Sequence, residues 1–197
     1  KETYGYEQFR NLEIYDDLSK GKEKLCISQG QLIENVILEA EKAWKGETQV
    51  DNILLTAPTG SGKSLLFQLP AIYLGKEYNL LTIVVSPLKA LIVDQVESLQ
   101  ELGYMRVAYA SSDLSPEQKM EVYRQVREGE IDLFYLSPEL LLSYDIKHFV
   151  GERRIGLVVV DEAHTVTTWG KEFRVDYWFL GRYLTALKQT LGYNFPL

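Results

Sequence analysis

The chain has 197 residues, a formal net charge of −7, 46% hydrophobic residues and 25% charged residues. These values are typical of one globular domain with a sizeable core, and no apolar run approaches the ~20 residues of a membrane span. The acidic balance argues against a broad electrostatic surface for nucleic acids. It is compatible with a narrow groove of amides, hydroxyls and a few basic groups.

Cys26 is the only cysteine of the sequence, and the chain shows no signal-peptide pattern. Both features favour a reducing, intracellular location in the cytoplasm, and we expect Cys26 to be a buried and inert thiol. The sequence begins with Lys1 rather than Met. We therefore expect the chain to be an excised or processed piece.

The first third of the chain leads into a glycine-rich loop. Residues 1–27 are polar, aromatic and irregular, and they predict an N-terminal arm. A helix is expected to begin near Ser28, because Ser28 and Gln31 fit a capping box and the apolar residues that follow have helical spacing. Residues 45–48 then indicate a loop, and the apolar run 53–55 predicts a strand before the glycine-rich segment.

Residues 57–64 read Ala-Pro-Thr-Gly-Ser-Gly-Lys-Ser and fit the phosphate-binding P-loop, with Ala57 in place of the usual first glycine. Glycines let backbone amides face phosphate oxygens, the following helix N-terminus adds partial positive charge, and Lys63 adds a full charge. Ser64 is placed to ligate the Mg²⁺ that accompanies a nucleotide. A plain glycine-rich turn before a helix is the alternative. The residues expected to bind the nucleotide are Thr59, Gly60, Ser61, Gly62, Lys63 and Ser64.

Strands and helices alternate after the loop. Strands are expected at 81–85, 107–110, 133–136 and 157–160, with a further one beginning at 195–197. Helices are expected at about 89–102, from Ser115 to near Gly129, and at 176–191, with short helical turns after 136. This alternation predicts an α/β fold with a mainly parallel sheet and helices on both faces. The functional residues would then gather at one edge of the sheet.

The apolar run 157–160 ends in Asp161-Glu162-Ala163-His164. Carboxylates at the tip of a buried parallel strand lie where ligands bind in open α/β sheets. We expect Asp161 to hold Mg²⁺ through its water shell and Glu162 to orient the attacking water. Lys63, Asp161 and Glu162 are therefore the candidate catalytic residues, with ATP and Mg²⁺ as cofactors. Two solvated acids in a turn are the alternative.

Four stretches resemble the first motor domain of superfamily 2 helicases, and more finely that of the RecQ family. They are the P-loop continued to Ala71, residues 85–88 (Val-Ser-Pro-Leu), the acidic block followed by Trp-Gly-Lys-Glu-Phe-Arg at 169–174, and Tyr-Gly-Tyr-Glu-Gln-Phe-Arg at 4–10. The resemblance implies a RecA-like P-loop NTPase domain at 28–197 and an arm at 1–27 with an adenine-recognition segment. Lys171, Glu172 and Val175 depart from the His, Asp and Pro that the family usually has.

The resemblance also implies roles for residues of the arm. Tyr6, Arg10 and Gln31 would recognise adenine. The position that matches the family's adenine-reading glutamine holds Glu13, so Gln31 would take this role after an insertion at residues 11–28. A helix cap is the alternative for Gln31, and a packed aromatic residue is the alternative for Tyr6.

A nucleic-acid strand would run along the same sheet edge. Trp169, Phe173 and Arg174 would stack on bases and report bound DNA, and His164 would relay that signal to the ATP site. Core packing is the alternative for Trp169, and a turn or cap role is the alternative for each serine. The residues expected to donate to sugar and phosphate oxygens are Ser86, Lys89, Ser111, Ser112 and Ser137.

These implications together describe the ATP-binding motor domain of an ATP-dependent, 3′–5′ DNA helicase. Its partners would be single-stranded and duplex DNA, a second motor domain of the parent chain, and accessory proteins, with no membrane. Because the second domain would supply a catalytic arginine, the isolated chain is expected to lack efficient hydrolysis and unwinding. The alternatives are an RNA helicase or another superfamily 2 translocase, and a nucleotide-gated interaction module in a defence or repair complex. A small-molecule kinase would leave the acidic block unexplained.

Overall fold

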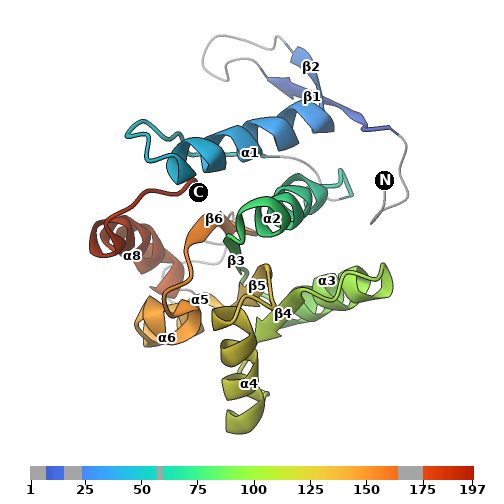
Figure 1. Cartoon of the computed structure of the whole chain (residues 1–197). Coiled ribbons are helices and arrows are strands. Elements are labelled where there is room, and N and C mark those ends of the chain that lie inside the picture. Colours follow the sequence, from blue (N-terminus) through green and yellow to red (C-terminus); the bar gives the residue numbers. More distant parts are fainter. Residues whose placement is uncertain (1–7, 16–23, 57–59, 164–174) are drawn as a thin grey trace.

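The computed structural model describes residues 8–15, 24–56, 60–163 and 175–197. Its centre is a parallel sheet with the strand order β4-β5-β3-β6 (Figure 1). The strands are β3 (Leu81–Val85), β4 (Val107–Ala110), β5 (Leu133–Leu136) and β6 (Ile155–Val160). All four match the strands expected from the sequence, and β6 begins two residues earlier than expected.

Helices cover both faces of the sheet. One apolar cluster joins the sheet to α1 (Gln29–Trp44), α2 (Leu65–Tyr78) and α3 (Lys89–Glu101). The other joins it to α4 (Pro116–Arg127), α5 (Pro138–Ser143), α6 (Ile146–Val150) and α8 (Val175–Leu191). Neighbouring residues of one strand enter opposite clusters, as Phe134 and Tyr135 do, because successive side chains of a strand point to opposite faces. The predicted α/β fold is therefore confirmed.

Helix starts follow the capping residues. Ser28 accepts a hydrogen bond from the Gln31 amide at 3.1 Å, and the Gln31 side chain accepts from the Ser28 amide at 3.0 Å. Ser115 and Gln118 form the same reciprocal pair before α4. Such pairs satisfy amides that have no partner within the helix, so both starts lie where the sequence predicts them.

The N-terminal arm corrects one prediction. Residues 1–27 were expected to be irregular, but β1 (Asn11–Tyr15) and β2 (Lys24–Ser28) form an antiparallel hairpin. Its cross-strand bonds involve backbone groups, which polar sequences also possess. Cys26 lies on β2 and is exposed, so the expectation of a buried thiol was wrong.

Two further expected strands, 53–55 and the start at 195–197, have no regular strand structure. Instead, the Ile53 amide donates to the Leu197 carbonyl at 2.9 Å, and the Val158 amide of β6 donates to the Pro196 carbonyl at 3.2 Å. The 195–197 segment is thus joined to β6 by one backbone bond and the 53–55 segment to Leu197 by another, and neither forms a ladder. Leu54 is 86% exposed, so its side chain contributes almost no apolar burial to hold this segment in place.

A buried ion cluster lies before the amino ends of β5 and β6. Asp132 is fully buried and accepts from Arg106 Nε at 2.6 Å, Arg153 Nη2 at 2.9 Å and Tyr104 Oη at 3.0 Å. Burial lowers the pKa of Arg153, and the Asp132 carboxylate opposes that shift. In the described ranges, no helix has both the length and the apolar composition needed to cross a lipid bilayer.

Candidate nucleotide site at the carboxyl edge of the sheet

Parallel pairing brings the residues after each strand to one edge of the sheet. Ser86, Ser111, Ser137 and Asp161 directly follow β3, β4, β5 and β6 in turn. The Asp161 amide donates to the Val85 carbonyl at 2.9 Å and so extends the β3–β6 ladder to the tip. This edge is where open α/β sheets bind ligands.

The described part of the glycine-rich loop turns directly into α2. Gly60 and Gly62 have φ angles of 79° and 82°, a left-handed conformation that glycine adopts without steric cost. The Leu65 and Leu66 amides donate to the Gly62 and Lys63 carbonyls at 3.2 and 3.0 Å. Ser64 is the N-cap residue of α2, but its side chain makes no capping hydrogen bond. Its hydroxyl is therefore not committed to the helix.

The acidic tip is held by a local bond. The Glu162 amide donates to Asp161 Oδ1 at 2.9 Å, which fixes the orientation of that carboxylate. Glu162 has a φ angle of 51°, an uncommon conformation for a residue other than glycine. Strained backbone of this kind occurs often at functional sites, and here it turns the chain sharply after β6.

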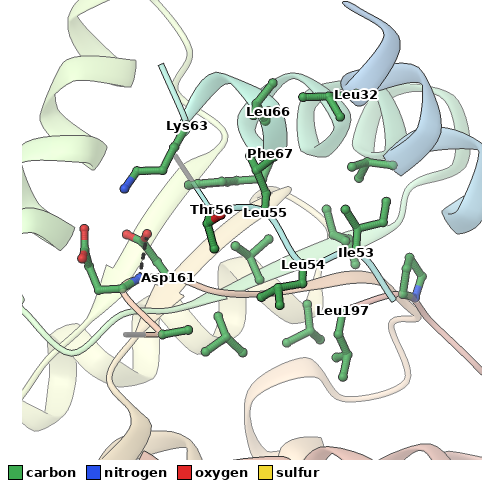
Figure 2. Close-up of a pocket in the computed structure, with 18 residues that line it drawn as sticks. Leu32, Ile53, Leu54, Leu55, Thr56, Lys63, Leu66, Phe67, Asp161 and Leu197 are labelled. Carbon is green, nitrogen blue, oxygen red and sulfur yellow. Dashed lines mark hydrogen bonds between the residues drawn. The ribbon is translucent and has the colours of Figure 1, made fainter. Parts of the chain in front are cut away.

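Lys63, Asp161 and Glu162 line one cavity of about 670 Å³. Figure 2 shows Lys63 and Asp161 at the same end of this cavity, with Ile53, Leu54 and Leu197 farther along it. The cavity therefore has a charged end and an apolar end. The remaining lining residues are Leu32, Val36, Leu55, Thr56, Leu66, Phe67, Leu157, Val158, Val159, Val160, Ala163 and Pro196.

The charged end suits a phosphate–metal group. Lys63 supplies a cation for phosphate oxygens, and Asp161 and Glu162 supply hard oxygen ligands. Ser64, the residue after Lys63, does not line the cavity, and its role as a Mg²⁺ ligand stays a prediction. Among the described residues, no group of three or more His, Cys, Asp or Glu side chains is placed to cage a metal. Mg²⁺ typically binds through one or two protein oxygens together with substrate phosphates, and the available groups fit that mode.

The arm meets this region through a residue that the sequence did not single out. Gln31 is exposed and occupied by its capping box, as the alternative interpretation of that residue expected. Gln29 is buried instead, with 3% exposure, and its side chain bonds to both Arg10 and Ser61. The contact joins positions 32 residues apart, so no local sequence pattern indicates it.

The expected nucleic-acid contacts differ in accessibility. Ser86 and Ser111 are only 2% and 7% exposed, and no described group bonds to either hydroxyl. Ser137 accepts from the Leu140 amide at 3.3 Å and caps α5, the alternative role that its sequence allows. Ser112 and Lys89 are exposed. Ser112 donates to Asp113, and Lys89 forms an ion pair with the same carboxylate.

Several expected site residues lie outside the described part of the chain. These residues are Tyr6 and Thr59, followed by the four positions of the block after Asp161 and Glu162, which are His164, Trp169, Phe173 and Arg174. Their roles stay predictions from the sequence.

Comparison with known proteins identifies the family. The model of the family described as DEAD/DEAH box helicase matches residues 33–192. The ATP-dependent DNA helicase RecQ of Synechocystis sp. is 42% identical over 141 residues, which cover 71% of this chain and 28% of that protein. RecQ of Haemophilus influenzae is 30% identical over 92% of this chain and 24% of its own length. The chain thus spans about a quarter of the length of these relatives.

Solved structures share the fold at low sequence identity. A hypothetical ATP-dependent RNA helicase from Sulfolobus tokodaii superposes with a TM-score of 0.51 at 20% identity, covering 84% of this chain and 49% of that one. The UvsW helicase from bacteriophage T4 gives 0.52 at 17% identity, covering 91% and 52%. These likenesses confirm the RecA-like α/β fold. The family match and the RecQ relatives along most of the sequence show that this chain belongs to the DEAD/DEAH box helicase family and is RecQ-like within it.

Proposed function

We propose that this chain is the ATP-binding motor domain of an ATP-dependent DNA helicase that moves in the 3′–5′ direction. The observation that carries the proposal is the shared cavity of Lys63, Asp161 and Glu162. A loop lysine and a strand-tip acid pair meeting in one cavity are the parts that phosphoryl transfer needs. The names of the RecQ relatives support DNA as the substrate. A protein that acts on DNA would work inside the cell, in the cytoplasm.

The residues divide the chemistry between them. The loop amides and Lys63 bind phosphate oxygens, while Ser64 and Asp161 hold Mg²⁺, whose charge offsets that of the phosphates. Glu162 orients a water for attack on the terminal phosphate. Tyr6, Arg10 and the side-chain NH₂ of Gln31, whose oxygen caps α1, recognise adenine. Thr59 completes the phosphate contacts.

DNA binds beside this site in the proposal. Lys89 and Ser112 are exposed on the same sheet edge and contact the sugar–phosphate backbone. Ser86, Ser111 and Ser137 complete that edge after local rearrangement. Trp169, Phe173 and Arg174 stack on bases, and His164 relays DNA binding to the acids.

A second motor domain of the parent protein supplies an arginine that speeds hydrolysis. Such an arginine is worth about 10³–10⁵ in rate. The isolated chain therefore binds ATP weakly and turns it over slowly. This chain covers only about a quarter of the RecQ relatives, so proteins of that length have room for a second motor domain. Accessory proteins are further partners.

The test is ATP hydrolysis by the parent protein with single-stranded DNA, with RNA, and with neither. We expect DNA to stimulate hydrolysis more than RNA does, and Glu162→Gln to abolish turnover while ATP binding persists. Stimulation by RNA alone would favour an RNA helicase. Turnover that survives Glu162→Gln would contradict the assigned role of this acid.

A second candidate is a nucleotide-gated interaction module that does not unwind DNA. The ion pair of Lys89 with Asp113 favours it, because the ammonium is already neutralised, and so does the burial of Ser86 and Ser111. This candidate predicts nucleotide-dependent binding of a protein partner that persists in Glu162→Gln, with no strand displacement by the parent protein.

A further inference from the structure

Gln29 is the first residue of α1 and one of few buried polar residues in the described part of the chain, with 3% exposure. Its amide N–H donates to the Arg10 carbonyl at 2.9 Å, and its Oε1 accepts from the Arg10 amide at 3.1 Å. Its Nε2 donates to the Ser61 carbonyl at 3.1 Å. One side chain thus bonds to the arm with its acceptor and to the glycine-rich loop with its donor.

The packing around Gln29 is close on both sides. A Cβ atom added to Gly62 would lie 2.7 Å from Gln29 Nε2, so a side chain there would collide with the amide. A Cβ atom added to Gly30 would lie 2.7 Å from Phe9 Cδ2 of the arm. The glycine at 62 thus leaves room for the Gln29 amide, and the glycine at 30 leaves room for Phe9 of the arm.

The bond to Ser61 also orients the loop. In a trans peptide the carbonyl and the following N–H point in opposite directions. Holding the Ser61 carbonyl toward Gln29 therefore directs the Gly62 N–H away from Gln29. An amide fixed in this way is prepared to donate to an anion on the far side of the loop.

The other end of the contact is the hairpin. Arg10 directly precedes β1, and Ser28, the last residue of β2, directly precedes Gln29. The two chain ends of the hairpin therefore meet at the residue that also holds the loop. The same side chain therefore contacts both the Ser61 carbonyl and the base of the hairpin.

We propose that Gln29 is a positioning residue that couples nucleotide binding at the loop to the order of the β1–β2 hairpin. This inference rests on the proposed binding of ATP at Lys63. A nucleotide that fixes the Ser61–Gly62 peptide strengthens the bond to Gln29, which then holds the Arg10 amide and the hairpin base. Coupling is reciprocal, so a firmly held hairpin base raises nucleotide affinity by the same factor.

Amide hydrogen exchange of the 197-residue chain tests this coupling, with and without Mg²⁺ and a non-hydrolysable ATP analogue at pH 8. In the wild type, the analogue should slow exchange at residues 60–64 and also at 11–15 and 24–28. Gln29→Glu keeps an acceptor for the Arg10 amide but replaces the donor to Ser61 with an oxygen. We expect this variant to lose the protection of the hairpin and about fivefold or more in analogue affinity.

Gln118→Glu is the matched control, because it makes the same chemical change in the first turn of α4, far from the loop in sequence. It should retain the hairpin protection. Exchange at β3 and β5 in the same samples reports whether each variant is folded. If Gln29→Glu does not fold, the wild-type measurement alone decides whether the loop and the hairpin are coupled.

The outcomes separate the two proposals. Protection at 60–64 without protection of the hairpin in the wild type would overturn the coupling and leave ATP binding intact. Hairpin protection that persists in a folded Gln29→Glu chain would overturn the role of Gln29. No protection at 60–64 would overturn the proposed nucleotide binding and the coupling with it.

Discussion

At the residue scale, Asp132 holds the amino ends of two strands together. It is fully buried, and the side chain of its partner Arg153 is only 4% exposed. A carbon atom added to Gly75 of α2 would lie 2.5 Å or less from Asp132 atoms, so the helix packs directly on the carboxylate. Removing the charge would leave a buried guanidinium with backbone carbonyls as its remaining partners.

We predict that Asp132→Asn lowers the free energy of unfolding by about 3–5 kcal/mol, because breaking a buried ion pair leaves an uncompensated charge. Urea denaturation measures the change. Glu121→Gln is the control, because it breaks an exposed pair with Arg124 and should cost at most about 1 kcal/mol. If the two variants lost similar free energies of unfolding, burial of the Asp132 ion pair would not explain its contribution to stability.

The residues of the candidate site differ in whether a local sequence pattern indicates them. Lys63, Asp161 and Glu162 could be named as candidates because each stands in a short pattern with a known chemical purpose, and all three line one cavity. Gln29 was missed, because its partners lie 19 and 32 residues away and it stands in no local sequence pattern. Gln31 drew attention through its capping pattern, and the structure uses it as a cap.

At the element scale, the β1–β2 hairpin lies outside the parallel sheet, and the residues on either side of it are in contact. The bond between the Gln29 amide and the Arg10 carbonyl joins the residues on either side of the hairpin. Of the hairpin residues that the structure describes, none belongs to either core cluster. The hairpin therefore adds little to the packing of the sheet, and its removal leaves the chain ends already in contact.

We predict that replacing residues 11–27 by two glycines leaves a cooperatively folded chain. The free energy of unfolding should change by less than about 1 kcal/mol, since closing a short loop costs little. Ser28 is retained because it caps α1. Chemical denaturation measures the effect, and loss of cooperative unfolding would show that the hairpin supports the fold.

Elements with local signals were predicted well. Capping boxes place the starts of α1 and α4, and continuous apolar runs place the four strands of the sheet. The hairpin was missed because its strands are short and mixed in polarity. The strand expected at 53–55 is absent because a strand needs a partner along its length, and this segment is joined to Leu197 by one backbone bond.

At the scale of the whole molecule, buried and partly buried tyrosines make the fold sensitive to alkali. Burial is the first cause that raises the pKa of Tyr104, Tyr123, Tyr183 and Tyr193. In the unfolded chain these phenols ionise near pH ~10. Above that pH the native state binds more protons than the unfolded state, so the stability present below it is lost as pH rises.

We predict that the free energy of unfolding falls between pH 9 and pH 11 in the wild type and falls less in Tyr104→Phe. Tyr104 is a sensitive choice because the nearby Asp132 carboxylate adds to the effect of burial on its pKa. Urea denaturation at the two pH values measures both slopes. Identical slopes would show that Tyr104 ionises alike in both states.

The proposed function depends on one cavity, which is lined by a loop lysine and two strand-tip acids. The most direct test is equilibrium binding of ATP with Mg²⁺ to the 197-residue chain. We predict saturable binding by the wild type and a loss of affinity of about tenfold or more, equal to about 1.4 kcal/mol, in Lys63→Ala. Lys76→Ala, in the last turn of the helix that follows the loop, should keep wild-type affinity. The absence of saturable binding by the wild type, or equal affinities in the two lysine variants, would contradict it.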